Sequence, residues 1–316
     1  MKTRNKLLTL LTLSTGAATT TAIINQYIKY SAVSKNLLMN PEAHCYKWRL
    51  GNIHYVKYGK GKPILLIHDL MPEFSGYQWN DFISILKEKY SVYVIDLLGC
   101  GRSEKPNITY TNYLYVQLLT DFIRSEIGHR TDIIASGASA SFSIMACSLT
   151  PELFDRLLFI NPDSILSNSL IPGKRAKLFK FILDTPIVGT LLYNIAVSKK
   201  SLEERFSQDY FNNPYSVKVD LIDWCYESAH LGESPKSVYA SVQCNYTKCN
   251  IVNALKKIDN SIYLIGGEYI DFIKERFDEY KKYNPAIEYA IVPHTKLIPQ
   301  LEAPDQVLKI VDMFLS

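Results

Sequence analysis

The fold of this chain is decided by residues 132–147, whose sequence is DIIASGASASFSIMAC. Their pattern predicts a short buried strand, a sharp turn of small residues and a helix of nearly unbroken apolar or small side chains. Side chains beside such a tight turn must be small, because larger ones would clash with the backbone. Strand, turn and helix together form the backbone of a nucleophile elbow, which carries a nucleophilic side chain at its tip. The residue at that tip is Gly137.

Predicted strands and helices alternate on both sides of this elbow. A hairpin is predicted at residues 45–58. Buried strands are predicted at 63–68, 91–96, 156–161, 261–266 and 287–293. Amphipathic helices are predicted at 78–88, 111–128, 272–283 and 304–315. Because the later strands are apolar on both faces, the pattern predicts an α/β fold with a mostly parallel sheet covered by helices on both faces.

One long segment interrupts this alternation. From residue 163 to 257 the sequence lacks strand patterns, and helical patterns broken by proline and glycine replace them. An all-helical insertion in the sheet domain is therefore predicted. We expect four segments: a hydrophobic leader helix with its linker, the first part of the α/β core, the helical insertion and the second part of the core. Their ranges are 1–37, 38–162, 163–257 and 258–316.

The N-terminal residues have the layout of a membrane-targeting segment. Lys2, Arg4 and Lys6 precede an uncharged run, residues 7–24. As a helix this run would span roughly 27 Å, which is close to the thickness of a bilayer core. We expect an uncleaved signal-anchor, with the bulk of the chain on the extracytoplasmic side of the membrane. The alternatives are a cleaved signal peptide, which would give a secreted protein, and a soluble amphipathic leader.

Composition argues against several classes of partner. With 35 basic and 31 acidic residues the net charge is +4, which is too small to indicate nucleic-acid binding. None of the six cysteines forms a C-x-x-C pair, so neither a metal site nor a thioredoxin-like site is predicted. Because the cysteines are scattered, we expect most of them to be free, buried thiols. No cofactor is predicted.

Four stretches resemble the α/β-hydrolase fold family, and the resemblance covers nearly the whole chain from about Cys45 onward. They are residues 65–68 (LLIH), the loop 96–103 (DLLGCGRS), the elbow, and residues 297–304 (LIPQLEAP). The loop and the last stretch are similar to the branch with a helical cap, which includes haloalkane dehalogenases, epoxide hydrolases and related esterases. This resemblance implies that residues 163–257 form the cap over an active-site mouth.

In that family a nucleophile, an acid and a histidine follow one another along the chain. The resemblance places the nucleophile position at Gly137, the acid position at Ile270 and the histidine position at Leu297. Asp271 lies one residue after the acid position, and His294 lies three residues before the histidine position. The triad is therefore interpreted as degenerate, because glycine cannot attack a substrate and leucine cannot carry a proton.

The oxyanion loop also departs from the family pattern, since its usual His-Gly is His68-Asp69 here. The resemblance assigns His68, Asp69, Leu70 and Ala138 to the oxyanion hole or to the edge of a pocket. His68 is expected to be structural. Residues that could restore catalysis by a non-standard route are Ser136, Ser139, Asp271 and His294, with Asp163 and Cys100 as further candidates.

Three functions remain open on the sequence. The first is a pseudohydrolase that keeps the fold and binds an apolar or acyl-type small molecule. The second is an active esterase-like or lipase-like hydrolase that uses non-standard residues. The third is a non-enzymatic interaction protein at a membrane surface. The basic, amphipathic segment 174–182 is typical of a membrane-surface helix or of a solvated face over a cap core.

Overall fold

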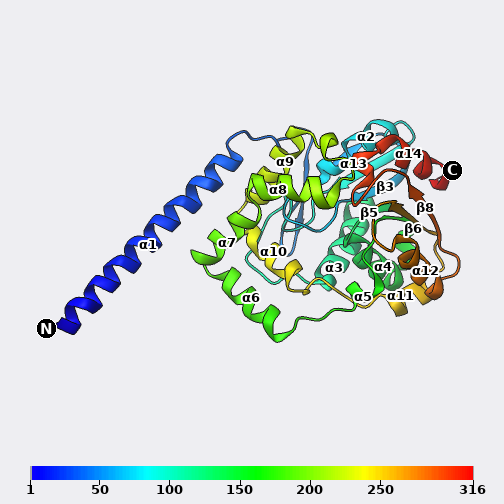
Figure 1. Cartoon of the computed structure of the whole chain (residues 1–316). Helices are drawn as coiled ribbons and strands as arrows, with labels where there is room; N and C mark the ends of the chain where they lie inside the picture. Colours follow the sequence, from blue (N-terminus) through cyan, green and yellow to red (C-terminus); the bar gives the residue numbers. More distant parts are fainter. Residues whose placement is uncertain (1, 316) are drawn as a thin grey trace.

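A computed structural model describes the backbone of residues 2–315 and the side chains of residues 14–315. One eight-stranded sheet with the order β1-β2-β4-β3-β5-β6-β7-β8 forms the centre of the protein (Figure 1). The strands are β1 (His44–Trp48), β2 (Gly51–Tyr58), β3 (Lys62–Ile67), β4 (Tyr90–Ile95), β5 (Thr131–Ser136), β6 (Phe154–Ile160), β7 (Ile262–Gly267) and β8 (Glu288–Val292). β1 and β2 form the predicted antiparallel hairpin, whereas β3 to β8 run parallel to one another. The predicted mostly parallel sheet is confirmed.

Alternate residues of the central strands pack into two apolar layers, one on each face of the sheet. The helices that cover the faces are α2 (Asn80–Leu86), α3 (Asn112–Phe122), α4 (Ser139–Leu149), α12 (Ile273–Tyr283) and α14 (Pro304–Leu315). Leu65 and Ile133 pack in the layer that contains side chains of α3, α4 and α12. Leu66 and Ile134 pack in the layer that contains side chains of α2 and α14. Burial on both faces explains the unbroken apolar sequence of these strands.

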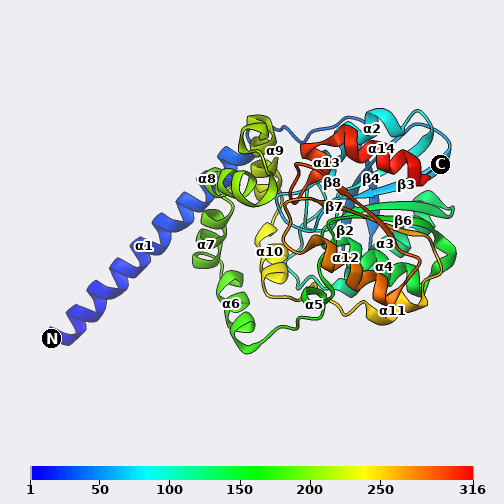
Figure 2. The same ribbon diagram turned by 45° about the vertical axis from the view of Figure 1, so that its right-hand side comes forward.

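The segment between β6 and β7, residues 163–257, is called the cap below, and every element described in it is helical. Its α-helices are α5 (Ile165–Asn168), α6 (Lys174–Asp184), α7 (Val188–Ala196), α8 (Lys199–Arg205), α9 (Val219–His230), α10 (Pro235–Gln243) and α11 (Val252–Lys257). Single turns at Phe206–Tyr210 and Pro214–Ser216 join α8 to α9. Figures 1 and 2 show α6 and α7 between the sheet and the N-terminal helix α1 (Lys2–Val33).

Helix α1 projects from the globular part of the chain in both views (Figures 1 and 2). The predicted anchor, residues 7–24, falls partly outside the residues whose side chains are described, and it stays a prediction. Within the described residues, no single helix is long and apolar enough to cross a membrane. The pair α6 and α7, bent by 102°, meets the same criterion when the two helices are taken together, by length and composition alone.

Local signals in the sequence account for several helix ends. The Thr111 hydroxyl caps α3 by accepting the Leu114 N–H at 3.3 Å, as an N-cap threonine should. Gly128, with φ of +71°, ends the helical segment that follows α3. The helix predicted at 78–88 is in fact two elements, because a 3₁₀ turn at Gly76–Trp79 precedes α2.

One buried carboxylate joins three neighbouring strands. Asp132, at the start of β5, accepts the backbone N–H of Arg156 in β6 at 3.0 Å. It also forms ion pairs with the Arg156 guanidinium at 3.0 Å and with the Lys62 ammonium, at the start of β3, at 2.9 Å. The Asp132 side chain is fully buried, so removing it would leave the backbone N–H of Arg156 without its acceptor.

We predict that Asp132→Ala lowers the free energy of unfolding by about 1–3 kcal/mol, the cost of unsatisfied buried donors. Asp155→Ala is the matched control, because Asp155 pairs with the same Lys62 but keeps 31% of its side chain exposed. That variant should change the free energy of unfolding by about 1 kcal/mol or less. Chemical denaturation of both variants measures the difference. Equal losses would contradict this assignment of Asp132.

Candidate functional site

Gly137 lies at the tip of the predicted elbow, between β5 and α4. Its φ is +56°, in the left-handed region, and its N–H donates to the Ile160 carbonyl of β6 at 2.9 Å. Ala138 follows it and leads directly into the first turn of α4. The backbone therefore has the geometry of a nucleophile elbow, although it carries no side chain at the tip.

The side chain of Asp69 occupies the space above that tip. A Cβ atom added at Gly137 would lie 2.2 Å from Cγ of Asp69, and 2.3 and 2.4 Å from its two carboxylate oxygens. No side chain can therefore stand at position 137 unless the Asp69 carboxylate moves. Asp69 belongs to the loop after β3, which faces the elbow across the carboxyl ends of neighbouring strands β3 and β5.

The same carboxylate accepts two backbone N–H groups beside the elbow. Its Oδ1 accepts the N–H of Ala138 at 2.8 Å and the N–H of Leu70 at 2.7 Å. In α/β-hydrolases the oxyanion hole is formed by the N–H of the residue after the nucleophile and by an N–H from the loop after β3. Ala138 follows the elbow tip and Leu70 belongs to the loop after β3, so the two N–H groups that donate to Asp69 come from the corresponding segments of this chain.

His68 holds the oxyanion loop in place. Its imidazole is fully buried, and Nε2 accepts the Leu97 N–H at 3.0 Å. Nδ1 lies 2.7 Å from the carbonyl oxygen of Asp69, so the ring is neutral, with its proton on Nδ1, which donates to that carbonyl. Burial also lowers the pKa of His68. Both ring nitrogens are thereby engaged by the backbone, which leaves neither free to accept a proton from a nucleophile.

The electrostatic environment brings Asp69 close to its titration midpoint at neutral pH. Burial, followed by the nearby carboxylate of Asp163, raises the pKa of Asp69 to about 7. The N–H donors of Ala138 and Leu70 and the ammonium of Lys248 oppose this rise, because they stabilise the charged carboxylate. Asp163 follows β6 and pairs with Lys248, near the end of the cap, at 2.6 Å. The pKa of one carboxyl group thus depends on four residues, which belong to the oxyanion loop, the elbow and the two ends of the cap.

The two candidate serines are both engaged by other groups. Ser136 is buried, and its hydroxyl accepts the Gln300 side-chain amide at 3.0 Å. Ser139 is also buried, and its hydroxyl donates to the His68 carbonyl at 2.5 Å. Neither hydroxyl hydrogen-bonds an imidazole among the described residues, although an activated serine requires such a base.

The acid and histidine positions hold apolar side chains in contact with the protein interior. Ile270 packs against the main apolar cluster, and Leu297 packs against a second cluster beneath the cap. Asp271 is exposed. His294 is exposed in the turn after β8, where its N–H donates to the Glu268 carboxylate at 2.8 Å. The structure does not bring Asp271, His294 and the elbow serines together.

Cys100 is also engaged by the protein interior. Its thiol is fully buried and donates to the Met71 carbonyl at 3.3 Å. Burial raises the pKa of Cys100 well above its usual range, which disfavours the nucleophilic thiolate. All six cysteines of the chain are free, and four of them are buried, as the sequence predicted.

The cap contacts both loops that flank the elbow. An apolar cluster joins the oxyanion loop, the histidine position and the cap; its members include Phe74, Phe206, Tyr210, Ile222, Leu297 and Ile298. The carboxylate of Glu73 adds an ion pair of 2.7 Å to Arg205, at the end of α8. Because Glu73 is fully buried, this ion pair fixes the cap on the loop that carries Asp69.

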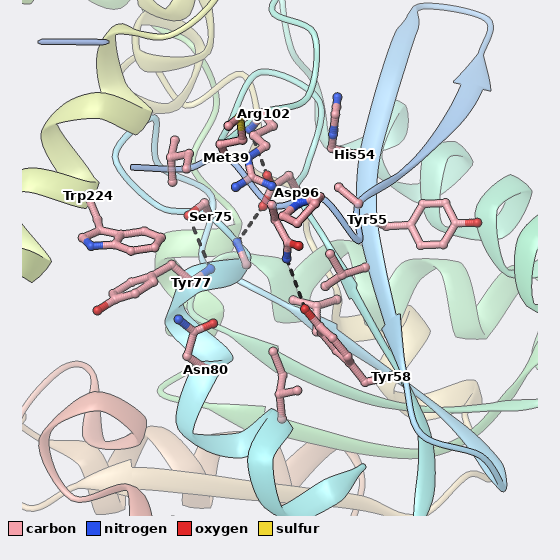
Figure 3. Close-up of a pocket in the computed structure, with 18 residues that line it drawn as sticks. Met39, His54, Tyr55, Tyr58, Ser75, Tyr77, Asn80, Asp96, Arg102 and Trp224 are labelled. Atoms are coloured by element: carbon pink, nitrogen blue, oxygen red, sulfur yellow. Dashed lines mark hydrogen bonds between the residues drawn. The ribbon is translucent and has the colours of Figure 1, made fainter. Parts of the chain in front are cut away.

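A separate cavity of about 190 Å³ lies between residues 38–43, β2 and the turn Gly76–Trp79 (Figure 3). Figure 3 shows the rings of Tyr77 and Trp224 together on one side of it, and their centroids are 4.0 Å apart. His54 also lines it, and Nδ1 of that ring is buried with no hydrogen-bond partner in the described structure. Gly137 and Asp69 are not among the residues that line this cavity.

Reasoning from the sequence identified Asp69 as a departure from the family pattern but missed its position. The signal was present in two linked exchanges. The family has a glycine in the oxyanion loop and a side chain at the elbow, whereas this chain has Asp69 in the loop and Gly137 at the elbow. Such a reciprocal change of size is typical of two positions that share one space.

Known proteins with similar sequences or structures include several hydrolases, although no family model matches the chain. The soluble epoxide hydrolase of Corynebacterium sp. (strain C12) is 44% identical over 125 residues, which are 38% of this chain and 39% of that relative. The haloalkane dehalogenase of Agrobacterium fabrum (strain C58) is 28% identical over 134 residues, which are 40% of this chain and 42% of that relative. A solved membrane phospholipase A has a TM-score of 0.68 and 18% identity, over 99% of this chain and 98% of its own.

The solved structures and the sheet topology show that the chain has the α/β-hydrolase fold. The resemblance drawn from the sequence is confirmed, since epoxide hydrolases and a haloalkane dehalogenase are among the relatives. The chain spans about two fifths of the length of the two curated relatives described above.

We predict that Asp69→Asn stabilises the protein more at pH 8 than at pH 5. The folded state raises the pKa of Asp69 to about 7. Asp69 therefore makes its full contribution to the free energy of unfolding at pH values below about 4, the pKa of the carboxyl group in the unfolded chain. That contribution is lost as the pH rises through 7, the pKa in the folded state. Asparagine keeps an oxygen for the N–H donors of Leu70 and Ala138 but does not ionise.

Thermal unfolding of the wild type and of Asp69→Asn at both pH values measures this effect. The gain in Tm should be larger at pH 8 by several degrees, since 1 kcal/mol corresponds to about 2–4 °C in a domain of this size. Asp271→Asn is the matched control, because Asp271 is exposed, and it should show no such pH dependence. An Asp69→Asn variant that loses stability at pH 8 relative to pH 5 would contradict the prediction.

Proposed function

We propose that this chain is a membrane-tethered α/β-hydrolase-fold protein in which the catalytic triad does not operate. The observation that carries the proposal is the position of the Asp69 carboxylate, 2.2 Å from where a Cβ of residue 137 would stand and bonded to both N–H donors of the oxyanion hole. The site is thereby occupied by a group of the protein itself.

Chemical requirements support this proposal. Triad catalysis needs a nucleophile, a base that takes its proton and donors that stabilise the developing oxyanion. Gly137 offers no nucleophile, Leu297 offers no base, and Asp69 already uses the donors. Loss of a triad member costs on the order of 10⁴ to 10⁶ in rate. An ionised Asp69 would also repel the negative charge that develops on a substrate oxygen.

The tether is supported by the uncharged run at residues 7–24 behind Lys2, Arg4 and Lys6. A solved protein that is described as a membrane phospholipase A is similar in structure to this chain. The match covers 99% of this chain and therefore includes part of α1. We propose that the bulk of the chain lies on the extracytoplasmic side of the membrane, since the basic end of such a segment stays in the cytoplasm.

A small apolar or acyl-type molecule is the ligand class that we propose. Several relatives are enzymes that act on small molecules, as their names state. The aromatic-lined cavity in Figure 3 is one place for such a ligand, because Tyr77, Trp224 and Val94 offer apolar surface around it. Asn80, Asp96 and Arg102 also line this cavity and give it polar groups beside the apolar ones.

A second candidate function is an active hydrolase in which Asp69 takes part in the chemistry. Its carboxyl group has a pKa of about 7, which suits an acid or base at neutral pH. It also lies at the position that the family uses for its nucleophile. The neighbouring Asp163 would be the second acidic group of such a site.

One experiment separates the two candidates. We predict that the full chain, purified in detergent micelles, forms no covalent adduct with an excess of a fluorophosphonate and hydrolyses no p-nitrophenyl ester above the background rate. Intact mass and absorbance measure the two outcomes, with a known serine hydrolase as the positive control. A stoichiometric adduct would overturn the proposal. Turnover that Asp69→Asn abolishes would establish the second candidate, whereas turnover lost in Ser136→Ala, Ser139→Ala or His294→Ala would assign catalysis to that residue.

A further inference from the structure

The corner of the cap formed by α6 and α7, residues 174–196, exposes an unusual number of apolar side chains. Phe181 is 70% exposed, Leu178 is 61% exposed and Ile195 is 59% exposed. Exposed apolar side chains of this corner also include Phe179, Ile182, Val188 and Leu192. Exposed apolar side chains gathered on two consecutive helices are a feature of surfaces that bind a partner or a membrane.

The shape of this corner is fixed by its packing. The axes of α6 and α7 are bent by 102° to each other. Gly189 makes the bend possible, because a Cβ atom there would lie 2.1 Å from the Leu183 carbonyl oxygen. Beneath the apolar surface Lys180 is buried and pairs with Asp184 at 2.7 Å. The exposed side chains are therefore presented by a rigid element rather than by a loose loop.

Hydrogen bonds join the corner to α1 at the end of its uncharged run. Asn25 is the residue after that run, and its side-chain amide donates to the Ile187 carbonyl at 3.1 Å. The amide of Asn194, in α7, donates to the Asn25 side-chain oxygen at 3.0 Å. Of the cap helices, α7 and α9 contact α1, and α6 precedes α7 on the same side of the cap (Figures 1 and 2). If α1 crosses a bilayer at residues 7–24, the corner lies at its surface.

The charges on the corner fit an anionic membrane. Lys174, Arg175 and Lys177 occupy the first turn of α6 and are exposed. Exposed cations such as these are attracted to a surface of anionic lipids. A cavity of about 240 Å³ between α1 and the cap is lined by Lys29, Lys236 and Glu233 at the same junction. Basic groups beside exposed phenylalanine and leucine are typical of helices that lie in a membrane interface.

We propose that the corner formed by α6 and α7 is a membrane-docking surface, which inserts its apolar side chains between the headgroups of an anionic bilayer. This inference rests on the tether in the proposed function, because α1 places the corner at the membrane. The docking surface adds a second contact between the chain and the membrane, which positions the cap against the lipid surface. The Glu73–Arg205 ion pair then also holds the oxyanion loop in a fixed place relative to that surface.

The test uses the full chain in vesicles of phosphatidylcholine and phosphatidylglycerol, with and without lipids brominated near the headgroup end of the acyl chain. Phe181→Trp places a fluorophore on the corner. Phe272→Trp is the matched control, because Phe272 is 78% exposed at the start of α12, away from α1 in both views (Figures 1 and 2). The signal of the parent chain, with its three tryptophans, is subtracted from each variant.

The proposal predicts that brominated lipid quenches the added tryptophan of Phe181→Trp and leaves that of Phe272→Trp unchanged. Equal quenching of the two variants, or none at either position while the chain sediments with the vesicles, would overturn the docking surface and leave the tether intact. A chain that does not sediment with vesicles would overturn the tether and this inference together. If the chain forms a dimer and brominated lipid does not quench the added tryptophan of Phe181→Trp, a second copy of the chain covers the corner. That result would also overturn the proposal.

Discussion

The contact between the Asp69 carboxylate and two backbone N–H groups is the constraint on which the site depends. Oδ1 of Asp69 accepts from Leu70 and Ala138, and the carboxyl carbon lies where a side chain of residue 137 would begin. Asp69 therefore satisfies two donors that an empty oxyanion hole leaves to water or to substrate. The elbow keeps its left-handed backbone at Gly137, which glycine adopts without strain, and carries no side chain at its tip.

This arrangement links three parts of the molecule. The oxyanion loop carries Asp69 at one point and Glu73 four residues later, and Glu73 pairs with Arg205 of the cap. The cap in turn bonds to α1 through Asn25 and Asn194. A continuous set of contacts thus runs from the occupied oxyanion hole through the cap to the N-terminal helix. These contacts position the cap relative to the sheet and to α1.

Much of the fold could be predicted from the sequence because its signals are local. Unbroken apolar runs such as residues 64–67 predict strands buried on both faces, and Thr111 with the spacing that follows it predicts α3. The division of the helix expected at 78–88 into a 3₁₀ turn and α2 was not predictable in this way, because Ser75 caps the turn with one hydroxyl. Helix type at such short elements depends on single hydrogen bonds.

For the candidate site, the sequence alone could predict only which side chains differ from the family pattern. Gly137 and Leu297 stand at the positions that the resemblance assigns to a nucleophile and a base, and neither residue can take these roles. The position of the Asp69 side chain depends on a contact between residues 69 positions apart, Asp69 and Ala138. Likewise, the hydrogen bond from the Ser139 hydroxyl to the His68 carbonyl is a tertiary contact, which the spacing of residues in the sequence does not predict. Resemblance to a family indicates which positions meet, but the side chain that fills the shared space must be seen in the structure.

The measurement that tests the central claim most directly is a double-mutant cycle between positions 69 and 137, read as free energies of unfolding. Gly137→Ala adds a Cβ that meets the Asp69 carboxylate at 2.2 Å, in addition to about 1–2 kcal/mol for a left-handed alanine. In the Asp69→Gly background only the backbone cost should remain, so the cycle should show a coupling of about 1 kcal/mol or more. An equal cost of Gly137→Ala in both backgrounds would contradict the claim that Asp69 occupies the place of the nucleophile.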